Sequence, residues 1–123
     1  MKYFFIGFTT LLLTACNNYG DKKVFGKGEL YYTSSITAEE ADKAGSKIQE
    51  TGYFTEDKAV SVQLDKTGST YKLRFVVNEK AFSDTAVDFS FKFIASSVSQ
   101  ALSNAVVVPE MCDNSFSTKR IIQ

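Results

Sequence analysis

Residues 59–77 read AVSVQLDKTGSTYKLRFVV and contain the clearest pair of strands in the sequence. Polar and apolar side chains alternate along both of its halves, and the apolar positions are Val60, Val62, Leu64, Tyr71, Leu73, Phe75 and Val77. Between the halves stands Lys66-Thr67-Gly68-Ser69, whose residue types favour a turn. Because period-two alternation places every second side chain on one face of a strand, we predict a β-hairpin with one apolar face.

A helix is expected on the N-terminal side of this hairpin. Thr37-Ala38-Glu39-Glu40 has the pattern of a capping box, in which the Thr and Glu side chains satisfy free N–H groups at the helix start. Small and apolar residues then share one face, at Ala38, Ala41, Ala44, Gly45 and Ile48. Gly52 suits the left-handed position that ends a helix. We therefore expect a helix that lies close to a sheet.

A second helix is expected over residues 86–103, after the capping candidates Ser83-Asp84-Thr85. Its apolar stripe consists of Val87, Phe91, Ile94, Val98, Ala101 and Leu102. Phe89 and Phe93 lie about 200° round the helix from Val87, so we expect both to face away from the sheet.

Three further stretches have the character of strands. Residues 29–35 (ELYYTSS) are rich in Tyr and Thr, residues 105–108 are an apolar run that indicates burial on both faces, and residues 116–122 read as a short last strand. The expected order is β-α-β-β-α-β, with an extra C-terminal strand if residues 116–122 join the sheet. This predicts an α+β fold in which two helices cover one face of an antiparallel sheet, in the ferredoxin-like arrangement.

The first sixteen residues, MKYFFIGFTTLLLTAC, carry the clearest functional signal. Lys2 precedes an apolar run of signal-peptide length, which is too short to span a bilayer. Leu13-Thr14-Ala15-Cys16 resembles the lipobox of bacterial lipoproteins. The resemblance implies that Cys16 receives a diacylglycerol and becomes the first residue of the mature chain. The alternatives are an ordinary secretory signal or an apolar first strand.

The resemblance implies that residues 1–15 are a signal peptide. We expect residues 16–27 to be the lipidated Cys and a polar tether, and residues 28–123 to be one α+β domain, since the length suits a single domain. The resemblance also implies a membrane-anchored domain in the cell envelope that faces the periplasm. Asn17 follows the Cys where an Asp would favour inner-membrane retention in enterobacterial relatives. The outer membrane is therefore the expected destination.

Composition argues against several classes of function. The full chain has 14 basic and 14 acidic residues, a balance that gives no footprint for nucleic acid. It has no His, the commonest general base and transition-metal ligand. The glycines lack the spacing of a phosphate-binding loop. We expect no enzyme activity, no cofactor and no metal.

The second cysteine, Cys112, would stand alone once Cys16 is lipidated, so no intrachain disulfide is expected. Two interpretations remain open for it. It is either a small buried hydrophobic residue, which we favour, or a free thiol for intermolecular pairing.

Two surfaces are candidates for binding. Phe89 and Phe93 would form an apolar ridge if exposed, unless the tether, the last strand or a dimer mate covers them. The second candidate is the open face of the sheet, with Tyr31, Thr33, Lys72, Arg74 and Val76.

Beyond the lipobox, three segments resemble small, uncharacterised periplasmic lipoproteins of Gram-negative bacteria with one compact α+β domain. They are LYYTSSITAEEA, SVQLDKTGSTYKLRFVV and Met111-Cys112-Asp113. We therefore expect a non-catalytic lipoprotein that binds an envelope protein. The alternative is an immunity or inhibitor lipoprotein that neutralises a toxin or enzyme.

Overall fold

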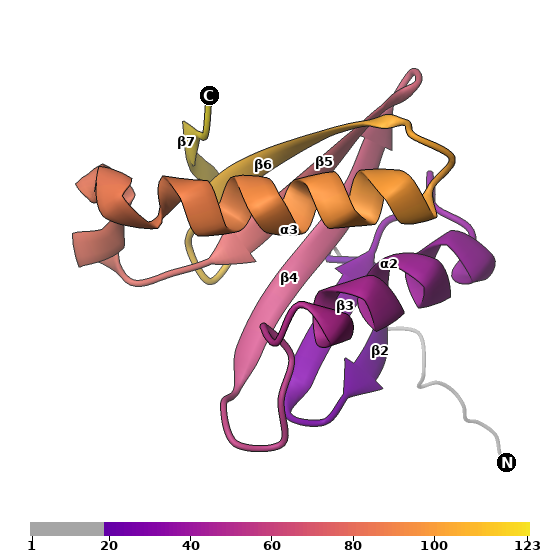
Figure 1. The fold of residues 1–123 in the computed structure, drawn as a ribbon, viewed down its shortest axis with the longest axis horizontal. Helices are drawn as coiled ribbons and strands as arrows, with labels where there is room; N and C mark the ends of the chain where they lie inside the picture. Colours follow the sequence, from indigo (N-terminus) through magenta and orange to yellow (C-terminus); the bar gives the residue numbers. More distant parts are fainter. Residues whose placement is uncertain (1–18) are drawn as a thin grey trace, which may run out of the picture.

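The computed structural model describes residues 19–123, so the expected signal peptide and lipidation site at Cys16 lie outside the described residues. Six strands and two α-helices form a two-layer α+β domain (Figure 1). The strands are β2 (Asp21–Phe25), β3 (Gly28–Tyr32), β4 (Val60–Thr67), β5 (Thr70–Val76), β6 (Val106–Cys112) and β7 (Thr118–Ile121). The helices are α2 (Ala38–Glu50) and α3 (Asp88–Ala101), and two short 3-10 turns, η1 (Glu79–Ser83) and η2 (Thr85–Val87), precede α3. No helix in the described part is long and apolar enough to cross a membrane.

The sheet is mixed, and its strands lie side by side in chain order, β2-β3-β4-β5-β6-β7. The hairpins β2/β3, β4/β5 and β6/β7 are antiparallel, whereas β3/β4 and β5/β6 are parallel pairs joined through α2 and α3. The α+β class and the two helices on one face are therefore confirmed. The ferredoxin-like arrangement is wrong, because it requires interleaved, antiparallel strands. The last strand does join the sheet, as β7 beside β6.

The two crossover connections have opposite hands. Both advance across the sheet in the same direction, from β3 to β4 and from β5 to β6. The second pair of strands, however, points the opposite way, since β5 is antiparallel to β4. Both helices cover the same face (Figure 1). Crossovers between parallel strands are right-handed by general rule, so one of these two departs from it.

The central hairpin is confirmed, but its turn is shorter than predicted, because Lys66 and Thr67 belong to β4 and pair with Tyr71 and Thr70. Val62 pairs with Phe75 and Leu64 with Leu73, and all four side chains are fully buried beneath the helices. From α2, Ala41, Ala44 and Ile48 enter the same core, and Phe91 and Val98 enter it from α3. The capping box is also present, with the Thr37 side chain accepting from Glu40 N and the Glu40 side chain accepting from Thr37 N.

Two details of the sequence-based picture need correction. The tether expected over residues 16–27 is shorter, because Asp21–Phe25 forms β2 and pairs with β3. The Phe25 ring packs against Gly45 of α2, which fixes this strand to the helix layer. The apolar run at 105–108 is not buried on both faces, since Val106 remains 62% exposed at the start of β6.

Candidate functional site

The Phe89–Phe93 ridge consists of those two side chains on the outer side of α3. Phe89 is 79% exposed and Phe93 is 56% exposed, whereas Phe91, Ile94 and Val98 of the same helix are buried. The helical spacing explains why some of these residues are buried and others exposed. The residues that pack on the sheet occupy one side of α3, and Phe89 and Phe93 fall outside that side. The direction in which both rings were predicted to point is confirmed.

A shallow groove runs beside the ridge, where the C-terminal end of α2 approaches the first turns of α3. Its volume is about 250 Å³, and its lining is Thr51, Gly52, Tyr53, Phe89, Ser90, Phe93 and Ile94. Gly52 allows this close approach, because its φ of +89° turns the chain sharply after α2. The next residue, Tyr53, is thereby directed back toward α3.

Tyr53 is the aromatic side chain that joins the groove to the core. Its ring meets those of Phe75 and Phe91 edge to face, with centroids 5.5 and 5.9 Å apart. Lys58 Nζ lies 5.1 Å from the ring centre, in the geometry of a cation–π contact. Burial raises the pKa of Tyr53 to about 12. Sequence analysis missed this residue, because its place depends on how α2 and α3 meet.

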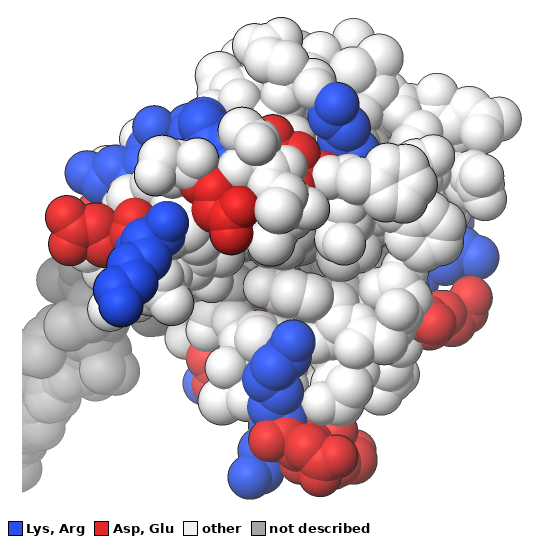
Figure 2. Space-filling model, turned by 60° about the vertical axis from the view of Figure 1, so that its left-hand side comes forward, with Lys and Arg blue, Asp and Glu red and all other residues white. Residues whose placement is uncertain are grey.

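The groove and ridge are suited to binding an apolar side chain of a protein. Pockets for small molecules generally have volumes of about 300–1,000 Å³ and enclose most of the ligand, which this groove does not. Two aromatic rings four residues apart on one helix do match the anchors found in protein interfaces. Figure 2 shows the end of the molecule with η1, η2 and the start of α3, where charged side chains occur in small groups with uncharged surface between them.

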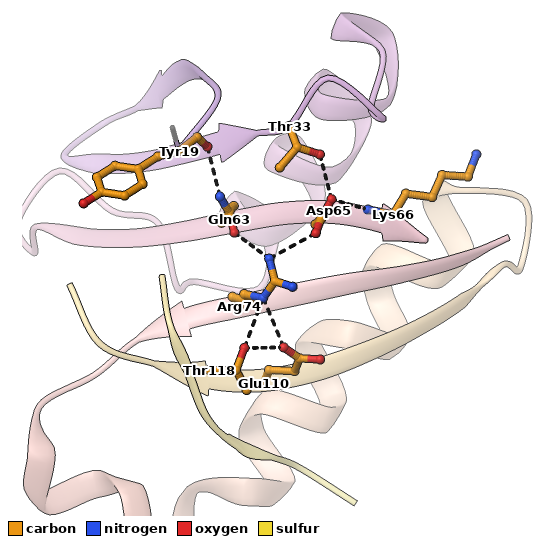
Figure 3. A network of polar contacts seen from close by, with 8 residues as sticks. All are labelled: Tyr19, Thr33, Gln63, Asp65, Lys66, Arg74, Glu110 and Thr118. Atoms are coloured by element: carbon orange, nitrogen blue, oxygen red, sulfur yellow. Dashed lines mark hydrogen bonds and ion pairs between the residues drawn. The ribbon is translucent and has the colours of Figure 1, made fainter. Parts of the chain in front are cut away.

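The open face is the face of the sheet that the helices leave uncovered, and its centre is Arg74 of β5 (Figure 3). Arg74 Nη1 donates to Gln63 Oε1 at 2.7 Å and to Asp65 Oδ2 at 3.2 Å, both on β4. Its Nε donates to Glu110 Oε1 of β6 at 3.1 Å. Thr118 Oγ1 of β7 donates to the same Glu110 oxygen at 2.7 Å. Arg74 Nε also donates to Thr118 Oγ1 at 3.2 Å, so side-chain contacts of Arg74 link β5 to β4, β6 and β7.

The charges of this network are closely paired. Glu110 is only 4% exposed, and a buried carboxylate is tolerated only with such partners. Burial by itself raises the pKa of Asp65, but hydrogen bonds from Thr33 and Lys66 N and the nearby Arg74 charge hold it below its ordinary value. Gln63 and Glu110 were missed by the sequence analysis, since only the strand register places them beside Arg74. The network has the character of a structural clamp across the sheet.

An aromatic cluster of Tyr19, Tyr31 and Phe116 covers part of the open face. The Phe116 ring lies 5.3 Å from that of Tyr19 and 5.2 Å from that of Tyr31, measured between centroids. Gln63 Nε2 donates to the Tyr19 carbonyl at 3.0 Å. Of the open-face residues proposed from sequence, Tyr31, Thr33, Lys72, Arg74 and Val76 do share this face.

Other parts of the described chain offer little chemistry. A hollow of about 690 Å³ lies beside η1 and is lined by Asn78, Glu79, Phe82, Asp113 and Lys119 among others. Lys119 Nζ lies 3.6 Å from Asp113 Oδ2, so these two charges already pair with each other. Over residues 19–123, no cluster of three or more His, Cys, Asp or Glu side chains could hold a metal ion. Cys112 is free and fully buried.

Comparisons with known proteins identify a family. Neither a search of curated proteins nor a search of solved structures found a match. A family model named AF_1994_N, described as a family N-terminal domain, matches residues 23–119, from within β2 to within β7. Because the match covers most of the chain, this protein belongs to the AF_1994_N family of N-terminal domains.

Proposed function

We propose that this protein is a lipid-anchored module of the cell envelope that acts by binding another protein through the Phe89–Phe93 ridge. The observation that carries the binding role is the exposure of these two rings beside the groove at Tyr53. The lipobox residues Leu13-Thr14-Ala15-Cys16 support the anchor. The absence of His from the chain supports a non-catalytic role.

Physical cost explains why the ridge points to a partner. Burying a Phe side chain contributes about 1.5–3 kcal/mol, and this chain forgoes most of that gain at two adjacent positions. Phe89 and Phe93 do not contribute to the core, since Phe91, Ile94 and Val98 already fill the side of α3 that packs on the sheet. A protein that inserts an apolar side chain into the groove would cover both rings.

The anchor is tested by replacing Cys16. In the native protein, palmitate labelling and an acylated N-terminal Cys are expected by mass spectrometry. Cys16→Ser should be unlabelled and remain unprocessed or leave the membrane fraction. Continued palmitate labelling of Cys16→Ser would contradict the lipobox assignment.

The binding role is tested by a photo-crosslinking amino acid at position 93, used in whole cells. A specific cross-linked partner is expected with this probe, and it should be lost when Phe89→Ser is added. Val106→Ser is the matched control, because Val106 is a similarly exposed apolar residue that belongs neither to the ridge nor to the lining of the groove. Phe89→Ser, Phe93→Ser should melt at nearly the native temperature, since both rings lie outside the core. The same cross-links with and without Phe89 would show that the ridge does not take part in binding.

The identity of the cross-linked partner distinguishes the two candidate roles. A structural envelope protein would support the role of an envelope-binding lipoprotein, and a toxin would support that of an immunity lipoprotein.

A further inference from the structure

We infer that the open face of the sheet around Tyr19 lies against the membrane surface, while the Phe89–Phe93 ridge is directed away from it. The partner assigned to the open face is thus a phospholipid bilayer. This inference rests on the proposed lipidation of Cys16 and adds an orientation to it.

The first step is the length of chain between the lipid and the domain. Because β2 begins at Asp21 and Tyr19 is already bound to the sheet, only Asn17 and Asn18 separate Cys16 from the folded domain. Three Cα-to-Cα steps reach at most about 11 Å. The headgroup layer is itself about 5–7 Å thick. A domain on so short a connection cannot stand clear of the bilayer.

The second step is the place where that connection ends. Gln63 is 4% exposed and donates to the Tyr19 carbonyl, so the backbone of Tyr19 is held over the middle of the open face. The Tyr19 ring packs edge to face on Phe116. Gly20 then passes so close to Tyr32 O that a Cβ there would come within 2.1 Å of it, which fixes the path of the chain into β2. The lipid is therefore attached on the open-face side.

The third step is the chemistry of that side. Tyr19 and Tyr31 lie together there, and tyrosine is enriched where proteins meet the headgroup layer. Lys22 Nζ lies 5.9 Å from the centre of the Tyr31 ring and forms an ion pair with Glu29 Oε2 at 3.3 Å, while its apolar stem is part of the same surface. Val24, on the same face of β2, is 61% exposed. The face near the lipid thus combines aromatic and apolar groups with the paired charges of Lys22 and Glu29.

The helix layer lies on the other side of the sheet (Figure 1). The Phe89–Phe93 ridge is on the outer side of α3, so the thickness of the domain separates it from the open face. A bilayer that meets Tyr19 therefore leaves the ridge free for a protein partner.

The chain contains no Trp, so one introduced Trp reports a single position. The full lipidated protein is placed in phosphatidylethanolamine–phosphatidylglycerol vesicles that contain phospholipids brominated near the headgroup end of the acyl chains. Val24→Trp probes the open face, and Phe89→Trp is the control on the ridge, at a position that is exposed as well. We expect several-fold stronger quenching of Val24→Trp than of Phe89→Trp. Equal quenching, or stronger quenching of Phe89→Trp, would overturn the orientation.

An insertion separates the effect of the short connection from that of the surface. About ten Gly and Ser residues between Asn18 and Tyr19 add a flexible coil of roughly 17 Å. If the short connection holds the open face down, the insertion should lower the quenching of Val24→Trp severalfold. Unchanged quenching would show that the connection does not set the orientation. Mass spectrometry of the same samples reports acylation directly, so a missing lipid is distinguished from a lipidated protein with a different orientation.

Discussion

Gly28 of β3 lies directly against the Phe54 ring, so closely that a Cβ at position 28 would come within 2.2 Å of Cδ1 and 2.6 Å of Cγ. Phe54 is 2% exposed and stacks on Phe25 with a centroid separation of 5.7 Å, so the ring has little room to move. Gly28→Ala is therefore expected to destabilise the domain by about 1–3 kcal/mol, the usual cost of overpacking a core. The measurement is denaturant unfolding. Gly68→Ala is a contrasting variant, because its Cβ would meet no atom and only its positive φ would oppose it. Native-like stability of Gly28→Ala would show that Phe54 can shift.

The sequence specified much of this fold locally. The β4/β5 hairpin and the α2 capping box depend on residues close together in the chain, and the structure places both as expected. Local sequence did not indicate which strands lie next to each hairpin in the sheet. Alternation determines which face of β3 carries Leu30, but a buried Leu fits equally well beside several partner strands. Crossovers between parallel strands are right-handed by general rule, and this protein departs from that rule once, so the rule would not have selected the observed strand order.

The candidate site likewise has features that local sequence predicts and features that depend on tertiary packing. The exposure of Phe89 and Phe93 followed from helical spacing alone. The groove beside them did not, since Tyr53 reaches it only through the packing of two helices. The Arg74 network depends on the register of three strands, which brings Gln63 and Glu110 to one point from distant parts of the chain.

Arg74→Met should be among the most damaging single changes on the open face. It leaves the Glu110 carboxylate, whose side chain is 5% exposed, without its cation. Removing one partner of a buried pair typically costs about 3–5 kcal/mol. The free energy of unfolding from urea titration is the measurement. Lys72→Met, on the same strand and face, should change it by about 0.5 kcal/mol or less.

A double variant shows whether the loss comes from the unpaired charge. Arg74→Met combined with Glu110→Met removes both members and should recover part of the stability lost in Arg74→Met alone. If the double variant lost as much stability as Arg74→Met and Glu110→Met together, Arg74 and Glu110 would act independently. The stabilising contacts of Arg74 would then have to be assigned to Asp65 and Gln63.

Asp65 predicts a specific pH dependence. The folded state holds the pKa of Asp65 below the reference value of 3.8, mainly through Thr33 and Lys66 N against the effect of burial. A carboxyl with a lowered folded pKa stabilises the protein above its unfolded pKa, and that contribution is lost as the pH falls through the folded pKa. Asp65→Asn should therefore be less stable than the native protein near neutral pH, and the gap should narrow below about pH 4. Melting temperatures of both proteins across this range provide the check. A gap that is independent of pH would mean that the charge of Asp65 does not contribute.

Cys112 should behave as a core residue rather than as a reactive thiol. Its side chain is fully buried, and burial raises the pKa of the thiol to about 12. Near pH 8 only on the order of one thiol in ten thousand would be the nucleophilic thiolate, and a reagent could reach it only after unfolding. In the Cys16→Ser protein, Cys112 is the remaining thiol. Without denaturant it should react with a thiol-specific reagent only as fast as the domain unfolds, and in denaturant it should react fast. Asn114→Cys, exposed two residues away, is the control and should react at once in the folded state. If Cys112 reacted equally fast without denaturant, intermolecular disulfide pairing would become the better account of this residue, because the folded domain would then present the thiol to other molecules.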